Sequence, residues 1–297
     1  PPSPPPSPPP PPSPPPPPSP PPFYPSEEGL VQLDSNDQNE LWGVTRSGDV
    51  FRRSMSYTGV WEHAPGASLK HVTSSKNYVY GVTQSDGVVR CKQPCRGIAR
   101  GDLAVNEAWR EMSGVSLKKI DVQVGSDNVF GLESTGAILF RRESTDGKRR
   151  GGSPVALTTT IGGFGGVTAN ARWVIGVSKY GGRVWRCKHP CSDADGWEAD
   201  EASFNFAQIS VTESNEMWAV NSDGKVYMKT LDAPLEDDWK SVEYSTGGRG
   251  AARMVSANDV KVCILDTKHK KPTCCDRSSG ECGTRPTWRW ASNLYQR

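Results

Sequence analysis

Short apolar runs separated by small polar turns recur along most of this chain. Each unit has an apolar run, a turn rich in Ser, Asp, Thr or Gly, and a second apolar run that often ends on Arg. Turn residues that tolerate positive φ between alternating apolar runs are typical of β-hairpins. Six such units are present, and they begin at Leu41, Val79, Val129, Val174, Met217 and, in a degenerate form, Val260.

The spacing of these units predicts their architecture. With Val44, Val82, Leu132, Val177, Val220 and Ile264 as markers, the steps are 38, 50, 45, 43 and 44 residues. A tryptophan and a further strand-like stretch precede most hairpins, so each period holds four short strands. A lone four-stranded blade cannot bury both of its faces and must stack on neighbours around a ring. We therefore predict an all-β, six-bladed β-propeller over residues 28–297.

The ends of the predicted propeller suggest how the ring closes. Residues 28–61 begin in mid-blade, and the chain ends on Trp288-Arg-Trp290, an element of the kind that starts a blade. We expect this C-terminal segment to complete blade one beside Leu30–Leu33.

The repeated unit resembles the tectonin repeat over about residues 26–297. Leu41-Trp42-Gly43-Val44 followed by Val50-Phe51-Arg52 is the best local match. The resemblance implies a six-bladed propeller, often of an extracellular or cell-surface lectin with glycan sites repeated around the ring. The units have diverged, since Tyr80 and Phe130 replace Trp and Ala219 replaces Gly.

Large rings recur within the units. We interpret them as packing between blades rather than as sugar platforms, because one ring at the same place in every blade is typical of a core. The residues are Trp42, Tyr80, Phe130, Trp173 and Trp218, with Trp61, Trp109, Trp197 and Trp239 between the hairpins.

A proline tract precedes the propeller. Eighteen of the first 22 residues are Pro and the other four are Ser, so residues 1–22 are predicted to form a polyproline II rod. At about 3.1 Å per residue the rod would span roughly 68 Å. Ser7, Ser13 and Ser19 are two turns apart and share one ridge of the rod. Residues 23–27 form a connector in which Phe23 and Tyr24 are candidates for docking the arm onto the propeller.

The Ser-Pro blocks resemble those of hydroxyproline-rich glycoproteins such as extensins, algal wall proteins and the shaft proteins of flagellar hairs. This resemblance implies secretion, prolyl hydroxylation and O-linked arabinose or galactose. The chain has no Asn-X-Ser/Thr sequon, so any sugar is expected on the tract. The candidate modification sites are Ser3, Pro4, Pro5, Pro6, Ser7, Pro8, Pro9, Pro10, Pro11, Pro12, Ser13, Pro14, Pro15, Pro16, Pro17, Pro18, Ser19, Pro20, Pro21 and Pro22.

Eight cysteines, an even number, favour an oxidising compartment. Cys91-Lys-Gln-Pro-Cys95 and Cys187-Lys-His-Pro-Cys191 are near copies 96 residues apart, and each can close a short disulfide loop. Zinc would need four ligands in one place, which two separated pairs do not provide. Cys263, Cys274, Cys275 and Cys282 are expected to form two more bridges, with three pairings open.

Charge and motifs narrow the function classes. The net charge is +2, which gives no overall basic field for a nucleic-acid partner, and no apolar run approaches the ~18 residues of a membrane span. The four histidines, His63, His71, His189 and His269, lie in separate segments without a recognised nucleophile motif. We therefore expect no catalytic, metal or cofactor site, and no enzyme.

Two functions remain. The first is a secreted structural glycoprotein that polymerises through its arm into a fibre, such as a wall, cell-surface or flagellar-hair-like filament, with other copies of itself as partners. The alternative is a secreted lectin that binds extracellular glycans and uses the arm as a stalk.

Overall fold

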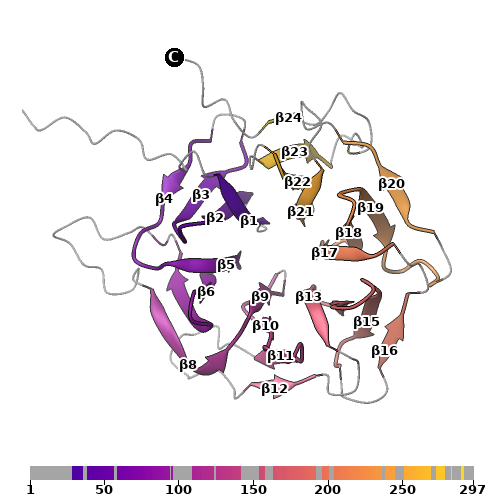
Figure 1. Ribbon diagram of the computed structural model, residues 1–297, viewed down its shortest axis with the longest axis horizontal. Coiled ribbons are helices and arrows are strands. Elements are labelled where there is room, and N and C mark those ends of the chain that lie inside the picture. Colours follow the sequence, from indigo (N-terminus) through magenta and orange to yellow (C-terminus); the bar gives the residue numbers. More distant parts are fainter. Residues whose placement is uncertain are drawn as a thin grey trace, which may run out of the picture.

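The protein is a six-bladed β-propeller. The computed structural model describes residues 29–35, 39–56, 59–93, 95, 109–123, 125–141, 154–157, 163–191, 196–200, 204–235, 238–244, 251–268, 272–277, 282 and 289–290. These residues form six four-stranded antiparallel sheets around a central axis (Figure 1). The predicted fold class is therefore confirmed. The proline tract, Phe23 and Tyr24 lie outside the described residues.

The strands follow one another from the axis outward in every blade. Blade one contains β1 (Leu30–Ser35), β2 (Glu40–Thr45), β3 (Val50–Ser54) and β4 (Glu62–His63). Blade two contains β5 (Leu69–Ser74), β6 (Tyr78–Thr83), β7 (Gly87–Lys92) and β8 (Arg110–Ser116). Blade three contains β9 (Lys119–Val122), β10 (Val129–Leu132), β11 (Ile138–Arg141) and β12 (Val155–Ala156).

The second half of the ring repeats the plan. Blade four contains β13 (Phe164–Ala169), β14 (Trp173–Ser178), β15 (Val184–Lys188) and β16 (Trp197–Ala199). Blade five contains β17 (Phe206–Val211), β18 (Glu216–Asn221), β19 (Val226–Thr230) and β20 (Lys240–Val242). Blade six contains β21 (Ala252–Ala257), β22 (Lys261–Asp266), β23 (Pro272–Asp276) and β24 (Arg289–Trp290). Among the described residues there is no helix with the length and hydropathy needed to cross a membrane.

The first described strand, β1, is the innermost strand of blade one, and the predicted closure of the ring is wrong. Trp290 pairs with Thr273, so β24 is the outermost strand of blade six rather than part of blade one. Blade one is built from its own four consecutive strands. The tryptophans between hairpins accordingly end blades: Trp61 comes directly before β4, and Trp239 directly before β20.

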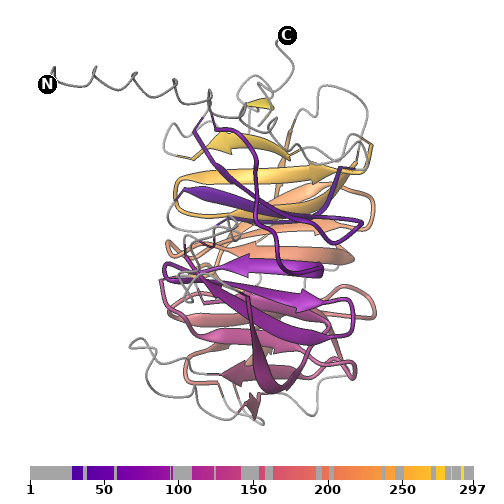
Figure 2. The same ribbon diagram turned by 90° about the vertical axis from the view of Figure 1, so that its left-hand side faces the viewer.

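Packing between the first and last blades closes the ring. Leu33, Leu41 and Phe51 of blade one share a buried cluster with Cys263 and Leu265 of blade six. Seen from the side, the first strands lie next to those of blade six (Figure 2). A shared strand is unnecessary because both faces of each blade are apolar and already covered by neighbours.

The strand register corrects two of the predicted equivalences. Val44 pairs with Gln32 and Leu265 pairs with Met254 at the same place in their blades, so Leu265 and not Ile264 is the sixth marker. Likewise Ile175, opposite Thr168, takes the aromatic position in blade four instead of Trp173. This position is at most 2 % exposed in every blade, and its occupants are Trp42, Tyr80, Phe130, Ile175, Trp218 and Cys263.

The glycine after this position is explained by close packing within the blade. A Cβ on Gly43 would lie 2.8 Å from Leu30 Cδ1, and a Cβ on Gly81 would lie 2.2 Å from Leu69 Cδ1. In blade six the large and small side chains exchange places. Ile264 occupies the glycine position of the second strand, and Ala252 occupies the position of Leu30 in the first strand. The Trp-Gly-Val pattern thus reports the packing of β1 on β2 and its counterparts.

All eight cysteines are paired, as Cys91–Cys95, Cys187–Cys191, Cys263–Cys274 and Cys275–Cys282. The two predicted short loops are therefore confirmed as disulfides. Three of the bridges start from one place in the third strand of blades two, four and six, at Cys91, Cys187 and Cys275. The same place in blades one, three and five holds a cation: Arg53, Arg141 and Lys229.

Two of these cations have different surroundings. Lys229 Nζ lies 2.9 Å from Asp200 Oδ2 of blade four, and neither side chain is more than 2 % exposed. The same nitrogen donates to Leu235 O at 2.8 Å. Arg53 is also buried, yet its Nε and Nη1 have no acceptor among the residues that the structure describes, and desolvation lowers the pKa of its guanidinium.

We predict opposite stability effects for the matched substitutions Lys229→Met and Arg53→Met. Losing Lys229 leaves Asp200 buried without its cation, which should lower the free energy of unfolding by about 3–5 kcal/mol. Losing Arg53 removes a costly buried charge, so Arg53→Met should be neutral or stabilising by up to about 2 kcal/mol. Urea unfolding measures both, and equal destabilisation by the two variants would contradict this account.

Candidate functional site

The innermost strands place a ring of short polar side chains around the propeller axis. The residue opposite the buried aromatic position is polar in every blade. The six residues are Asp34, Thr73, Asp121, Thr168, Ser210 and Ser256. We call them the axial ring. Because strand residues alternate between faces, this position points away from the apolar cluster that the preceding residue joins.

Members of the axial ring bond to the next blade. Asp34 Oδ2 accepts from Ser74 N at 2.9 Å and from Ser74 Oγ at 3.0 Å. Ser210 Oγ accepts from Ala257 N at 3.0 Å. Ser256 Oγ accepts from Ser35 N at 2.8 Å, which joins blade six to blade one. Three of these four bonds satisfy a backbone N–H group on the inner edge of a strand, where no further strand can pair.

Longer side chains two residues before the axial ring also bond to the backbone of the next blade, at a deeper level of the channel. Gln32 bridges both backbone groups of Val72, donating from Nε2 to its carbonyl at 2.8 Å and accepting from its N–H at 3.1 Å. Gln208 Oε1 accepts from Val255 N at 2.8 Å. Lys119 donates to the carbonyl of Gly165. The channel wall is therefore sealed by side chains that cross from one blade to the next.

A polar cavity opens at the end of the channel that holds the axial ring. Its empty volume is about 350 Å³, open solvent included. All six blades contribute to its lining, which consists of Asp34, Ser35, Thr73, Ser74, Ser75, Asp121, Val122, Gly125, Thr168, Ser210, Val211 and Ala257. Hydroxyl groups and two carboxylates dominate, so the cavity can exchange hydrogen bonds with a polar, hydroxyl-rich ligand or with water.

Asp121 is a strongly perturbed acid of the cavity. Burial raises the pKa of its carboxyl to about 6, while hydrogen bonds from Thr168, Ala169 and Thr73 act in the opposite direction. Its Oδ2 accepts from Ala169 N at 3.2 Å and its Oδ1 from Thr73 Oγ1 at 3.3 Å. The carboxylate joins blades two, three and four.

His71, deeper in the channel, shifts in the opposite sense. Burial lowers the pKa of its imidazole to about 3, and Lys119 and Lys70 add repulsion. Burial also lowers the pKa of the Lys119 ammonium. The two ends of the channel thus differ in character, with carboxylates at the cavity and cations below.

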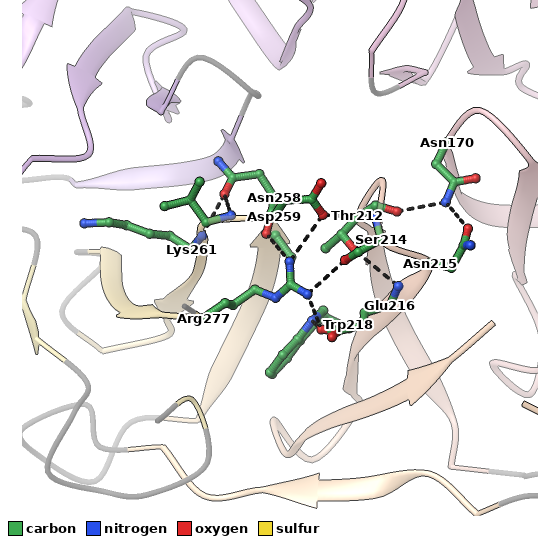
Figure 3. Close-up of polar contacts among 12 residues, drawn as sticks. Asn170, Thr212, Ser214, Asn215, Glu216, Trp218, Asn258, Asp259, Lys261 and Arg277 are labelled. Atoms are coloured by element: carbon green, nitrogen blue, oxygen red, sulfur yellow. Dashed lines mark hydrogen bonds and ion pairs between the residues drawn. The ribbon is translucent and has the colours of Figure 1, made fainter. Parts of the chain in front are cut away.

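Polar turns of blades four, five and six, just beyond strand ends that line the cavity, join neighbouring blades (Figure 3). Arg277, just after β23, reaches Glu216 Oε2 of blade five at 2.7 Å and Asp259 Oδ1 of its own blade at 3.3 Å. Ser214 N donates to the same Asp259 oxygen at 3.0 Å. Asn170 of blade four donates to Thr212 O at 2.8 Å. These contacts hold the rim of the cavity in one geometry.

The residues predicted from the sequence do not meet in this site. Seven cysteines lie at the third strands and beyond, and Cys263 lies in the second strand of blade six. The repeated aromatic side chains pack between blades, where Trp109, Trp173 and Trp197 are partly buried and the others are buried. His63 is in β4 and His71 in β5, while His269 lies outside the described residues. Sequence reasoning missed the axial ring. Its signal was present as an Asp, Ser or Thr near the end of the strand that precedes each Trp-Gly-type motif.

We predict that His71→Gln reduces acid sensitivity. The folded pKa of about 3 is below the ordinary value of 6.5, so the unfolded chain binds the proton and stability falls as the pH drops from 6.5 toward 3. When the pH is lowered from 7.5 to 4.5, the free energy of unfolding of the variant should rise by about 2 kcal/mol relative to that of wild type. Urea unfolding at the two pH values checks this, and parallel profiles would contradict it.

Asp121→Asn is predicted to act in the opposite direction. The folded pKa of about 6 exceeds the ordinary value of 3.8, so the folded state binds the proton and wild type gains stability as the pH falls through 6. When the pH is lowered from 7.5 to 4.5, the free energy of unfolding of the variant should therefore fall by about 2 kcal/mol relative to that of wild type. A variant that follows the wild-type profile would show that Asp121 ionises normally.

Comparisons with known proteins agree with the fold. Residues 19–179 match a family model described as the tectonin domain. No curated protein is similar enough in sequence to match.

Solved structures match at low identity. Human WBSCR16 is 10% identical with a TM-score of 0.56, over 90% of this chain and 82% of that one. The β-propeller domain of Cps50 (Swd1) from Myceliophteria thermophila is 12% identical with a TM-score of 0.55, over 84% of this chain and 83% of that one. YCF48 bound to D1 peptide is 15% identical with a TM-score of 0.53, over 90% and 82%. Such identities support the fold alone. Since the family model covers more than half of the sequence and the repeats build six blades, the chain belongs to the tectonin family.

Proposed function

We propose that this chain is a secreted, non-catalytic structural glycoprotein. The propeller acts as a rigid bead, and the hydroxylated and O-glycosylated Ser-Pro tract joins copies into an extracellular fibre or a cell-surface or wall filament. One observation carries the proposal: the aromatic side chain at the position of Trp42 is at most 2 % exposed in each blade that has one. The repeated aromatic side chains therefore serve packing, and the Ser-Pro tract is left as the distinctive element of the sequence.

The disulfides support the secreted location. All eight cysteines are paired, and four bridges in one chain are typical of an oxidising compartment. The bridges and the rim contacts of Arg277 favour a body that keeps its shape under load. A stiff tract loses little conformational entropy when it docks, which suits it to polymerisation. Contacts between unlike surfaces that do not close into a ring extend into filaments.

The axial cavity favours a second candidate, a lectin. Hydroxyl groups and the carboxylates of Asp34 and Asp121 line one concave site, and such groups recognise sugar hydroxyls. In this alternative a single glycan site lies on the axis instead of repeated sites around the ring. Asp34→Ala should then abolish glycan binding.

Deleting residues 1–22 separates the two functions. Protein secreted by a host that hydroxylates proline should form filaments when full length and single propellers when truncated, as seen by sedimentation velocity and electron microscopy. A Gly-Ser segment of equal length is the matched control and should not restore filaments, because it lacks the stiffness of the tract.

Filaments formed equally well by the truncated chain would refute the fibre function. A full-length chain that stays monomeric, and whose glycan binding the deletion leaves unchanged, would favour the lectin.

A further inference from the structure

The turn between β14 and β15 presents an exposed aromatic side chain. Tyr180 is 74 % exposed, the largest exposed fraction among the large hydrophobic residues described. Residues 178–183 separate the paired Val177 and Val184, whereas residues 221–225 separate Val220 and Val226 in blade five. Blade four therefore carries one additional residue, and the turn displays a ring that the described part of the chain leaves largely uncovered.

The turn is rigid. Ser178 Oγ donates to Tyr180 O and accepts from Arg183 N, both at 2.9 Å. Lys179 N donates to Gly163 O at 3.0 Å. Gly181 and Gly182 adopt φ of 76° and 59°, values that favour glycine. The side chain of Tyr180 thus projects from a fixed base.

Blade five fixes the other side of the turn. Phe206 N donates to Gly182 O at 3.1 Å, and a Cβ on Gly182 would lie 2.3 Å from Phe206 N. Phe204, two residues before this contact, is partly exposed and stacks on Tyr227 with centroids 4.7 Å apart. We define the Tyr180 patch as Lys179, Tyr180, Arg183 and Phe204, which flank one contact between blades.

The chemistry of the patch suits a polyproline II segment. Lys179 Nζ lies over one face of the Tyr180 ring, 5.5 Å from its centroid, which steadies the ring while most of its surface stays exposed. Aromatic side chains on preformed surfaces bind proline rings, and the ligand loses little entropy because its helix is already formed. The same chain carries such a ligand in residues 1–22, with 18 prolines.

We propose that the Tyr180 patch binds the Ser-Pro tract of a second copy of this chain. The tract precedes blade one, whereas the patch is on blade four, across the ring (Figure 1). A rod of roughly 68 Å reaches blade four of another copy without folding back over its own propeller. The inference rests on the proposed fibre function and names its contact surface.

The test uses the full-length chain and a fluorescent peptide of residues 1–22, in proline and 4-hydroxyproline forms. Anisotropy titration should give saturable binding of at least one form. Tyr180→Ser should weaken it about tenfold or more, the loss expected for an anchoring aromatic side chain. Val260→Ser, at another exposed apolar residue on a turn of blade six, is the matched control and should change affinity less than about twofold.

Thermal unfolding separates binding from folding, since an exposed side chain such as Tyr180 should leave the melting temperature unchanged. Equal peptide affinity in Tyr180→Ser and wild type, or no binding of either peptide, would overturn the inference. So would a Tyr180→Ser variant that loses glycan binding but keeps the peptide, because the patch would then be a sugar site.

Filament formation by the same variants distinguishes this inference from the proposed function. Filaments that persist in Tyr180→Ser would refute the patch and keep the fibre. Peptide binding through Tyr180 in a full-length chain that never forms filaments would refute the fibre and keep the patch.

Discussion

The unpaired inner edge of each blade is the constraint on which the structure depends. Six strands present one edge to the axis, where there is no room for another strand, and buried N–H and C=O groups without partners are costly. Side chains such as Gln32, Asp34 and Ser256 supply those partners from the neighbouring blade. The blades are therefore joined at the axis by directional hydrogen bonds, and the polar cavity is a product of that requirement.

Apolar packing acts at larger radius and is less directional. The position of Trp42 accepts Tyr, Phe, Ile and Cys in other blades while staying buried. The axial ring varies less, with only Asp, Thr and Ser, and four of its members accept from a backbone N–H of the next blade. This division explains how repeats with little sequence in common build equivalent blades.

The sequence was sufficient for the blade count, and insufficient for the blade boundaries. The hairpins and their spacing are local features, and they predict a propeller directly. The boundary between blades depends on which strand pairs with the Trp-bearing segment, a long-range choice that Trp61 and Trp288 do not reveal. The axial ring escaped notice for a related reason: a single Asp or Ser in a strand has no meaning until the ring places six of them together. The sequence pattern points to Ile264 rather than Leu265 as the sixth marker, because the exchange of size between Ile264 and Ala252 is visible only in the strand register.

Cysteine and a cationic residue alternate at one position of the third strand around the ring, which groups the six blades into two sets of three. Blades two, four and six share one solution, and blades one, three and five share the other. The smallest repeating unit of this pattern is accordingly a pair of blades, present three times. A ring with an odd number of blades would break the alternation at one seam.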